Sequence, residues 1–255
     1  MSNRHSPTEL IEETLGGGSM PPPESTLIQD TISRTVQINR DIAAQRKQAA
    51  ADLRSQFSRR GTLVINLVSS PGAGKTSLLE ATAKHWAGRR RMAVLVGDIA
   101  TERDAERLAP FTPVRQLTTG GACHLELELV ERGLAQLPQA DYEFLFIENI
   151  GNLVCPASHD LAEHRRVVLV STTEGDDKPG KYPKMFRTSQ AMLVTKTDLL
   201  PYVPFDVQAV VEDARRIQGQ LDVFQISSLH GEGIDAWCDW LEQQRQQMLR
   251  AEVKT

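Results

Sequence analysis

Hydrophobic residues in this chain gather in short continuous runs, separated by stretches in which they recur at helical spacing. The runs predict buried strands at residues 63–68, 92–96, 114–117, 142–147, 167–171, 191–195 and 223–226. Hydrophobic residues at helical spacing predict helices in the segment that begins at Ser77 and at residues 101–108, 125–137 and 234–250. Strands that are apolar throughout and alternate with helices are typical of a parallel sheet covered on both faces. The pattern therefore predicts an α/β fold with a mostly parallel sheet.

Two segments of different character precede the first of these strands. Residues 1–24 contain a Gly-Gly-Gly-Ser run and three consecutive prolines, which predict a disordered tail. Residues 25–60 place Ile28, Ile32 and Val36, and later Ala49, Leu53 and Phe57, at helical spacing without an internal Gly or Pro. This basic segment is predicted to be an N-terminal extension of one or two amphipathic helices. Either it packs on the main domain, residues 61–250, or it is an arm that binds a partner.

The composition narrows the classes of function. The 255 residues carry a formal net charge of −4, which does not suggest a nucleic-acid or membrane surface. No apolar run is long enough to span a bilayer, and the first ten residues lack the apolar stretch of a secretory signal. Three cysteines are too few for a disulfide framework and suggest reduced thiols. We therefore expect a cytoplasmic protein.

A glycine-rich turn joins the first predicted strand to the first predicted helix of the main domain. It reads Ser69-Ser70-Pro71-Gly72-Ala73-Gly74-Lys75-Thr76 and departs from the usual phosphate-binding pattern only in its first residue, where Ser69 replaces Gly. Backbone N–H groups of such a turn point at phosphates, and the following helix adds its positive dipole end. The nucleotide-binding residues predicted here are Gly72, Ala73, Gly74, Lys75, Thr76 and Ser77. The motif predicts a P-loop nucleotide-binding fold.

A second motif, Thr195-Lys196-Thr197-Asp198, follows a later strand and predicts recognition of guanine. The Asp198 carboxylate can accept hydrogen bonds from the guanine ring N–H and amino group, whereas adenine presents the wrong donors. Hydrogen bonds to a charged group contribute about 1.5–3 kcal/mol, enough for at least tenfold preference for GTP. Lys196 is expected to pack over the base, and Thr195, in place of the usual Asn, to brace the loop more weakly. Ser227 and Ser228 fit a supporting loop beside the guanine.

Two acidic residues at strand ends can complete a Mg²⁺ site with Thr76. Asp98 ends the second strand, and Glu148 begins Glu148-Asn149-Ile150-Gly151, where an Asp-x-x-Gly motif is usual. Mg²⁺ binds few protein carboxylates and keeps several waters, so one direct and one water-mediated ligand suffice. The predicted catalytic set is therefore Lys75, Thr76, Asp98 and Glu148. Neither a catalytic base nor an arginine finger is evident, so we expect slow hydrolysis.

These motifs together resemble the hydrogenase nickel-incorporation GTPase HypB, of the SIMIBI class. The resemblance covers roughly residues 38–241 and is carried by the runs VSSPGAGKTSLLE, GDIATERDAERL, TGGACHLE, FLFIENIGNLVCP, TEGDDKPGKYPKMFR and TKTDLLPY. It implies a GTPase that delivers nickel to [NiFe]-hydrogenase precursors, forms a nucleotide-dependent homodimer and works with the metallochaperone HypA. The N-terminal Cys motif and the His-rich stretch of some members are absent here.

The expected transition-metal ligands are Cys123, His124 and Cys155. They are distant in sequence, but each lies at or just beyond a loop at the carboxyl side of the predicted sheet. Two thiolates and one imidazole suit Zn²⁺ or Ni²⁺ and leave a position for a partner's ligand. The resemblance implies that these residues form the metal site of the GTPase domain, at the dimer interface. Cys238 is expected in the core, and the two histidines after Cys155 on the surface or beside the metal ligands.

The position of Cys155 shortly after Gly151 suggests that metal affinity depends on the nucleotide state, because the loop at Gly151 should sense the γ-phosphate.

Three alternative functions fit the sequence less well. A urease nickel GTPase fits the Cys-His-plus-Cys spacing poorly, and a metal-storage protein would need more His and Cys. Asp198 disfavours an ATP-dependent kinase.

Overall fold

The computed structural model describes residues 24–98 and 103–253. The predicted tail, over residues 1–23, lies outside the described residues, as does the start of the helix expected at 101–108. The chain divides into two units, residues 1–44 and 45–255. The described part of the first unit is helical and exposes Val36, Ile38 and Ile42. It is the first part of α1 (Glu24–Arg60), and the rest of α1 belongs to the second unit.

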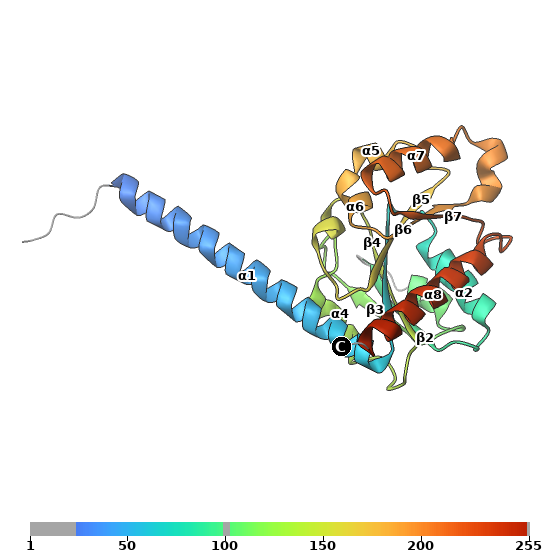
Figure 1. Cartoon of the computed structure of the whole chain (residues 1–255), viewed down its shortest axis with the longest axis horizontal. Coiled ribbons are helices and arrows are strands. Elements are labelled where there is room, and N and C mark those ends of the chain that lie inside the picture. Colours follow the sequence, from blue (N-terminus) through green and yellow to red (C-terminus); the bar gives the residue numbers. More distant parts are fainter. Residues whose placement is uncertain (1–23, 99–102, 254–255) are drawn as a thin grey trace, which may run out of the picture. The chain divides into compact units, whose positions relative to one another are not determined.

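The second unit is built on a parallel sheet, which the described residues form from seven strands in the order β3-β2-β4-β1-β5-β6-β7 (Figure 1). The strands are β1 (Leu63–Ser69), β2 (Met92–Asp98), β3 (Val114–Thr118), β4 (Phe144–Gly151), β5 (Arg165–Ser171), β6 (Ala191–Thr195) and β7 (Asp222–Ile226). Each neighbouring pair is parallel, and β1, β2, β4 and β5 are buried along most of their length. The expected mostly parallel α/β P-loop fold with an N-terminal helical extension is confirmed.

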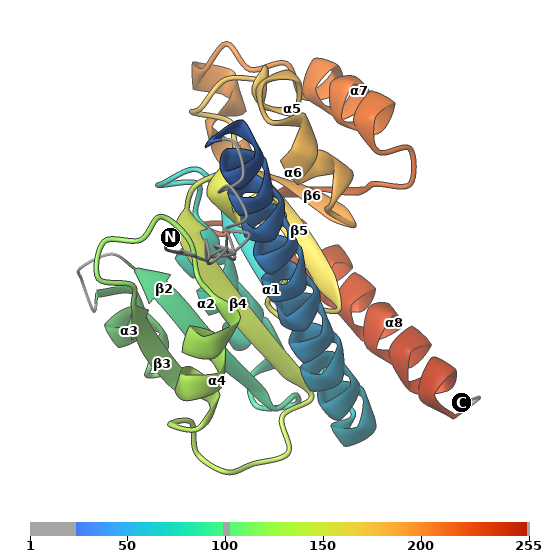
Figure 2. The same ribbon diagram turned by 90° about the vertical axis from the view of Figure 1, so that its left-hand side faces the viewer.

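Helices cover both faces of the sheet because successive strand residues point to opposite sides. On one face, Leu63 and Ile65 pack with α2 (Lys75–Trp86) and α8 (Ile234–Glu252). On the other face, Val64 packs in a cluster with residues of α4 (Leu127–Leu134) and of the last turns of α1 (Figure 2). A third cluster joins β5 and β6 to the helices that follow them.

Several element boundaries differ from the sequence-based expectation. The strand expected at residues 142–147 begins two residues later and continues to Gly151 as β4. Because β4 lies between β1 and β2, Glu148 is still part of the sheet and pairs with Leu67. α4 is shorter than the expected helix at 125–137. In α1 Ala50 and Phe57 are buried, while Ala49 is exposed. α3 (Arg103–Leu108) is the described part of the helix expected at residues 101–108. The helices and 3-10 turns that the sequence did not predict are α5 (Lys178–Lys181), α6 (Pro183–Arg187), α7 (Val207–Ile217), η1 (Cys155–Ser158) and η2 (Thr197–Tyr202).

Candidate nucleotide and metal sites

The glycine-rich turn after β1 forms one wall of a pocket of about 400 Å³ at the carboxyl ends of the strands. Gly72 and Gly74 have φ of +76° and +93°, a region that favours glycine, and a Cβ on either would meet nothing within 4 Å. The open space on the concave side of this turn fits a phosphate chain, and α2 begins directly after it. The pocket is lined by Pro71, Gly72, Gly74, Lys75, Thr76, Ser77, Gly97, Asp98, Asp104, Arg107, Glu148, Asn149, Ile150, Gly151 and Lys196.

Lys75 is buried and bonds back to the start of its own turn. Its Nζ donates to Ser69 Oγ at 2.9 Å, and burial lowers the pKa of the ammonium, while Glu148 and nearby acids oppose that shift. Ser69, the one departure from the usual motif, thus provides an acceptor for the lysine. Because that hydroxyl is a neutral partner, the ammonium gains by meeting an anionic phosphate instead.

Glu148 lies at the bottom of the pocket, where its Oε1 accepts a hydrogen bond from Thr76 Oγ1 at 2.8 Å. Glu148 is 4% exposed, and burial raises the pKa of its carboxyl to about 7. Its Oε2 is buried without a hydrogen-bond partner. An orphaned buried carboxylate oxygen next to a threonine hydroxyl is suited to a hard cation such as Mg²⁺. Asp98, at the end of β2, lines the same pocket.

α3 brings two further charged residues to this pocket that the sequence analysis did not single out, Asp104 and Arg107. Arg107 Nη2 lies 3.0 Å from Glu80 Oε2 and 3.3 Å from Ser77 Oγ. Their position in the sequence could have indicated this, since Asp104 and Arg107 come within nine residues of Asp98, at the carboxyl end of β2. Arg107 is half-exposed, so its guanidinium is free of the constraints of a core side chain.

The Thr-Lys-Thr-Asp segment is attached firmly to the glycine-rich turn. Thr195 Oγ1 donates to the Ala73 carbonyl at 2.7 Å, so this threonine braces the two loops against each other. The expectation that this brace is weaker than that of the usual Asn stays a prediction. Lys196 adopts a left-handed conformation (φ +58°), and Asp198 Oδ1 accepts from Ser227 Oγ at 2.7 Å. Asp198, Ser227 and the half-buried Ser228 lie outside the lining of the phosphate pocket.

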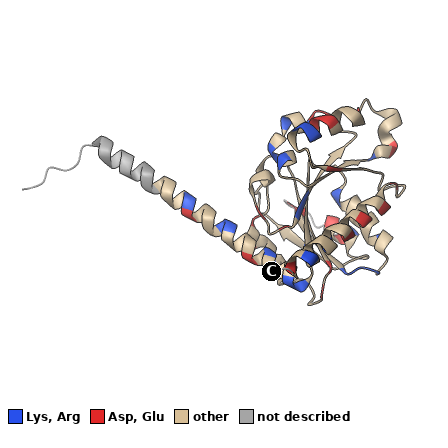
Figure 3. Ribbon diagram, in the orientation of Figure 1, with Lys and Arg blue, Asp and Glu red and all other residues tan. Residues whose placement is uncertain are grey.

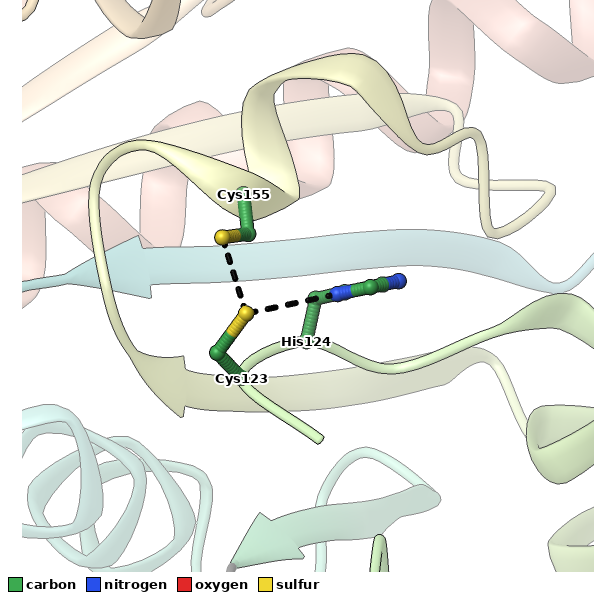
Figure 4. A group of neighbouring side chains, drawn as sticks. All are labelled: Cys123, His124 and Cys155. Carbon is green, nitrogen blue, oxygen red and sulfur yellow. Dashed lines mark hydrogen bonds between the residues drawn. The ribbon is translucent and has the colours of Figure 1, made fainter. Parts of the chain in front are cut away.

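The structure brings Cys123, His124 and Cys155 together (Figure 4). One ligand atom from each residue lies within 4.8 Å of the others, and the sulfurs of the two cysteines are 2.8 Å apart. Cys123 Sγ lies 3.7 Å from His124 Nδ1. The contact with Cys155 is the main reason that the pKa of the Cys123 thiol is raised. Two thiols and an imidazole converging in this way suit a soft or borderline metal ion.

The two histidines after Cys155, expected on the surface or beside the metal ligands, are both half-buried, and His159 lies beside the ligands. The His159 ring stacks on His124 at 3.8 Å between ring centroids, and its Nδ1 lies 2.9 Å from the Cys155 carbonyl oxygen. His164 Nδ1 accepts from the Val64 N–H at 2.9 Å, and burial lowers the pKa of this imidazole to about 4. The surface interpretation is wrong for His164, because Ser58 near the end of α1 contacts its Nε2 at 3.0 Å. Cys238 is buried as expected, and burial raises the pKa of its thiol to about 12.

One loop connects the two sites. β4 ends at Gly151, and the chain reaches Cys155 at the start of η1. The Asn152 side chain donates to the Cys123 carbonyl at 3.2 Å and accepts from the Val154 N–H at 2.8 Å. The loop that leaves the nucleotide pocket therefore holds both cysteine-bearing segments.

Comparisons with known proteins agree with this arrangement. The family model "CobW/HypB/UreG, nucleotide-binding domain" matches residues 63–225. The hydrogenase maturation factor HypB of Azotobacter vinelandii is 46% identical over 222 residues, covering 87% of this chain and 73% of that protein. The hydrogenase/urease maturation factor HypB of Helicobacter hepaticus is 42% identical over 221 residues, covering 84% and 90%.

A solved structure is similar as well. The crystal structure of HypB from Helicobacter pylori in complex with nickel superposes with a TM-score of 0.74 and 34% identity, covering 80% of this chain and 96% of that one. The residues that the family model matches include the glycine-rich turn, the Thr-Lys-Thr-Asp segment and the loop from Gly151 to Cys155. The chain belongs to the HypB family, within the CobW/HypB/UreG group of nucleotide-binding proteins.

Proposed function

We propose that this protein is a GTP-hydrolysing nickel metallochaperone that inserts nickel during maturation of [NiFe]-hydrogenase, with its nucleotide state coupled to metal binding. The observation that carries the proposal is the convergence of Cys123, His124 and Cys155 at the end of a loop that starts in the nucleotide pocket. The names of the related maturation factors and the nickel complex of the Helicobacter pylori protein support it.

The nucleotide site is assigned by chemistry and position. The backbone from Gly72 to Ser77 and the Lys75 ammonium would hold the phosphates of GTP or GDP. Thr76 and Glu148, with Asp98, would hold Mg²⁺, which neutralises charge on the transferred phosphoryl group. Asp198 would read the guanine edge, and Ser227 fixes the orientation of that carboxylate. Lys196 and Ser228 would complete the base pocket.

Hydrolysis is expected to be slow, as in a switch protein. Its rate depends on positioning and on neutralising the phosphates, which Lys75 can do from within the pocket. Arg107 can add a second positive charge if its guanidinium leaves Glu80 for the nucleotide, because it already lines the same pocket. No described side chain stands out as a base toward the attacking water.

Nickel is the cargo of the proposed reaction, with Zn²⁺ as a second metal that the same ligands can hold. Three ligands from one chain leave a coordination position open, so the metal can be passed to another protein. The proposed partners are HypA, as nickel donor or acceptor, and the hydrogenase large-subunit precursor, as recipient. We also propose a nucleotide-dependent homodimer. The described residues contain no helix that is long and apolar enough to cross a membrane. A cytoplasmic location and the absence of nucleic-acid partners are proposed on composition.

The test is nickel transfer to a hydrogenase precursor by the wild-type protein, Cys123→Ala and Cys238→Ala. Cys238→Ala is the matched control, because it removes a thiol from the core and leaves the three ligands in place. We expect loss of transfer in Cys123→Ala only. Equal transfer by all three proteins would exclude the proposed delivery site, and faster turnover of ATP than of GTP would exclude the GTPase.

A further inference from the structure

A line of buried polar side chains connects the nucleotide pocket to residues 157–163, the segment that follows Cys155. It begins at Asn149, which lines the pocket and whose Nδ2 donates to Asn66 Oδ1 on β1 at 3.3 Å. Asn66 Nδ2 in turn donates to Glu163 Oε1, also at 3.3 Å. Asn66 is 0% and Asn149 1% exposed. Buried amides of this kind keep their partners because an unpaired one is costly.

Arg166 anchors the far end of this line with every donor in use. A guanidinium has five N–H groups. Nε and Nη2 donate to Glu163 Oε1 at 3.0 and 2.6 Å, Nη2 also to the His159 carbonyl at 2.6 Å, and Nη1 to the Ala157 carbonyl at 3.3 Å and Thr188 Oγ1 at 2.9 Å. Four of these five bonds go to the segment 157–163. Because no donor remains for a ligand, Arg166 holds the segment and does not bind a ligand.

The segment that Arg166 holds sets the positions of two of the metal-binding side chains. It follows Cys155 directly through η1, and His159 Nδ1 lies 2.9 Å from the Cys155 carbonyl oxygen. The same His159 ring stacks on His124. Displacing the segment would therefore move the sulfur of Cys155 and the imidazole of His124 together.

We propose that Asn66 is the positioning residue through which the nucleotide state reaches the nickel site. It is hydrogen-bonded on one side to Asn149, the residue next to Glu148, and on the other side to Glu163. A shift of Asn149 that keeps its bond to Asn66 therefore changes the contact with Glu163. This inference rests on the proposed function, since it requires nickel and nucleotide to bind with a shared coupling free energy. It adds a path across β1 to the direct one along the chain from Gly151 to Cys155.

The experiment measures the affinity for Ni²⁺ alone, by competition with a chromogenic chelator, in the full chain loaded with Mg²⁺ and either GDP or a non-hydrolysable GTP analogue. The variant is Asn66→Ala. The control is Thr188→Val, which removes the one hydrogen bond that the Arg166 guanidinium makes outside the 157–163 segment among the described residues. GDP affinity shows whether each variant is folded, and Asn66→Ser, whose hydroxyl is too short to reach both partners, replaces Asn66→Ala if that variant does not fold.

For the wild type and Thr188→Val we expect nickel affinities that differ at least about fivefold between the two nucleotide states, a typical allosteric ratio. For Asn66→Ala we expect a ratio at least about twofold smaller than in the wild type, because only the direct path along the chain remains; the thiolate-to-nickel absorption band should be unchanged because all three ligands remain. By reciprocity, nickel should alter the affinity for the analogue by the same smaller factor. An Asn66 variant with the wild-type ratio would overturn this inference and leave the proposed function standing. A ratio of one in the wild type would overturn both.

Discussion

The backbone of Gly151 lies so close to Pro71 that a Cβ added to Gly151 would come within 2.7 Å of the Pro71 Cα. Pro71 belongs to the turn that would cradle phosphates, and Gly151 begins the loop that leads to Cys155. The two pockets thus share a backbone contact as well as a loop. A backbone neighbour cannot rotate away as a flexible side chain can, so this contact is sensitive to one added methyl group.

Gly151→Ala should therefore weaken the nucleotide site. We expect at least about tenfold lower affinity for GDP, because the new methyl group must push the phosphate-binding turn or the end of β4 out of place. Gly180→Ala is the control: a Cβ there would meet nothing within 4 Å. Fluorescence titration with a labelled GDP measures both. Unchanged GDP affinity in Gly151→Ala would show that the turn tolerates the displacement.

Glu148→Gln should alter stability and function in opposite directions. The Glu148 carboxyl has a pKa of about 7 in the folded protein, above its ordinary value of 4.5. Between pH 4.5 and 7, the folded protein therefore keeps a proton on Glu148 that the unfolded chain has lost. Glu148 therefore lowers stability as pH rises through 4.5–7 and costs up to about 3 kcal/mol above pH 7. Without Mg²⁺ or nucleotide, the glutamine variant should be the more stable protein at pH 8, by urea unfolding.

The same substitution removes a charge from the proposed Mg²⁺ site. Mg²⁺-dependent GTP hydrolysis should fall by at least about a hundredfold in Glu148→Gln, since the neutral amide is a poor ligand for a hard cation. Single-turnover hydrolysis over a range of Mg²⁺ concentrations measures the loss. Full activity in the variant would remove Glu148 from the proposed site.

Asp198→Asn should change which base the protein prefers. The carboxylate would accept from the guanine ring N–H and amino group, whereas an amide can donate to the 2-oxo group of xanthine. We expect GTP affinity to fall at least about tenfold and xanthosine triphosphate to bind better than GTP. Ser227→Ala, which removes the hydroxyl that orients Asp198, should show a smaller loss without the change of preference. Competition titrations with both nucleotides test this, and unaltered GTP preference in Asp198→Asn would contradict the assignment.

His164 should make the folded state sensitive to acid. Its folded pKa of about 4 is below the ordinary 6.5, so between these values the unfolded chain binds a proton that the folded protein does not. This contribution to stability is complete above pH 6.5 and is lost as pH falls toward 4, by up to about 3 kcal/mol.

Glu148 changes stability in the opposite sense over much of this range, so the difference between wild type and a variant is the quantity to measure. His164→Asn retains an acceptor for the Val64 N–H but does not titrate. Relative to the wild type, this variant should gain stability as pH falls from 7 to 4.5, in urea unfolding at each pH. A constant difference would show that His164 does not charge on unfolding.

Most of the fold was predictable because the strands of a sheet covered on both faces are continuous apolar runs. The end of β4 was not predictable in this way. Glu148 and Asn149 look like loop residues in the sequence, yet they are 4% and 1% exposed because β1 and β2 flank them. α5 and α6 could not be predicted either. They have only four and five residues, too few to show helical spacing, and each has a proline in its first turn.

Some features of the candidate site could likewise be predicted from the sequence, and others could not. Lys75 and Thr76 follow the first predicted strand through the glycine-rich turn, and Glu148 comes directly after the predicted strand at residues 142–147. Parallel strand ends converge, so the proximity of these three residues could be expected. The stacking of His159 on His124 and the hold of Arg166 on the 157–163 segment depend on side-chain contacts between distant residues. No periodicity or spacing in a single sequence encodes such contacts. For the same reason, the brace between Thr195 and Ala73 became evident only from the structure.

The central claim is that the guanine-nucleotide pocket and the Cys123–His124–Cys155 group act on each other. The most direct measurement is a nickel titration of the wild-type protein loaded first with Mg²⁺ and GDP and then with Mg²⁺ and a non-hydrolysable GTP analogue, with Cys155→Ala beside it. The account predicts nickel affinities at least about fivefold apart in the wild type and loss of that tight binding in the variant. Equal affinities in both nucleotide states, or tight binding that survives Cys155→Ala, would contradict it.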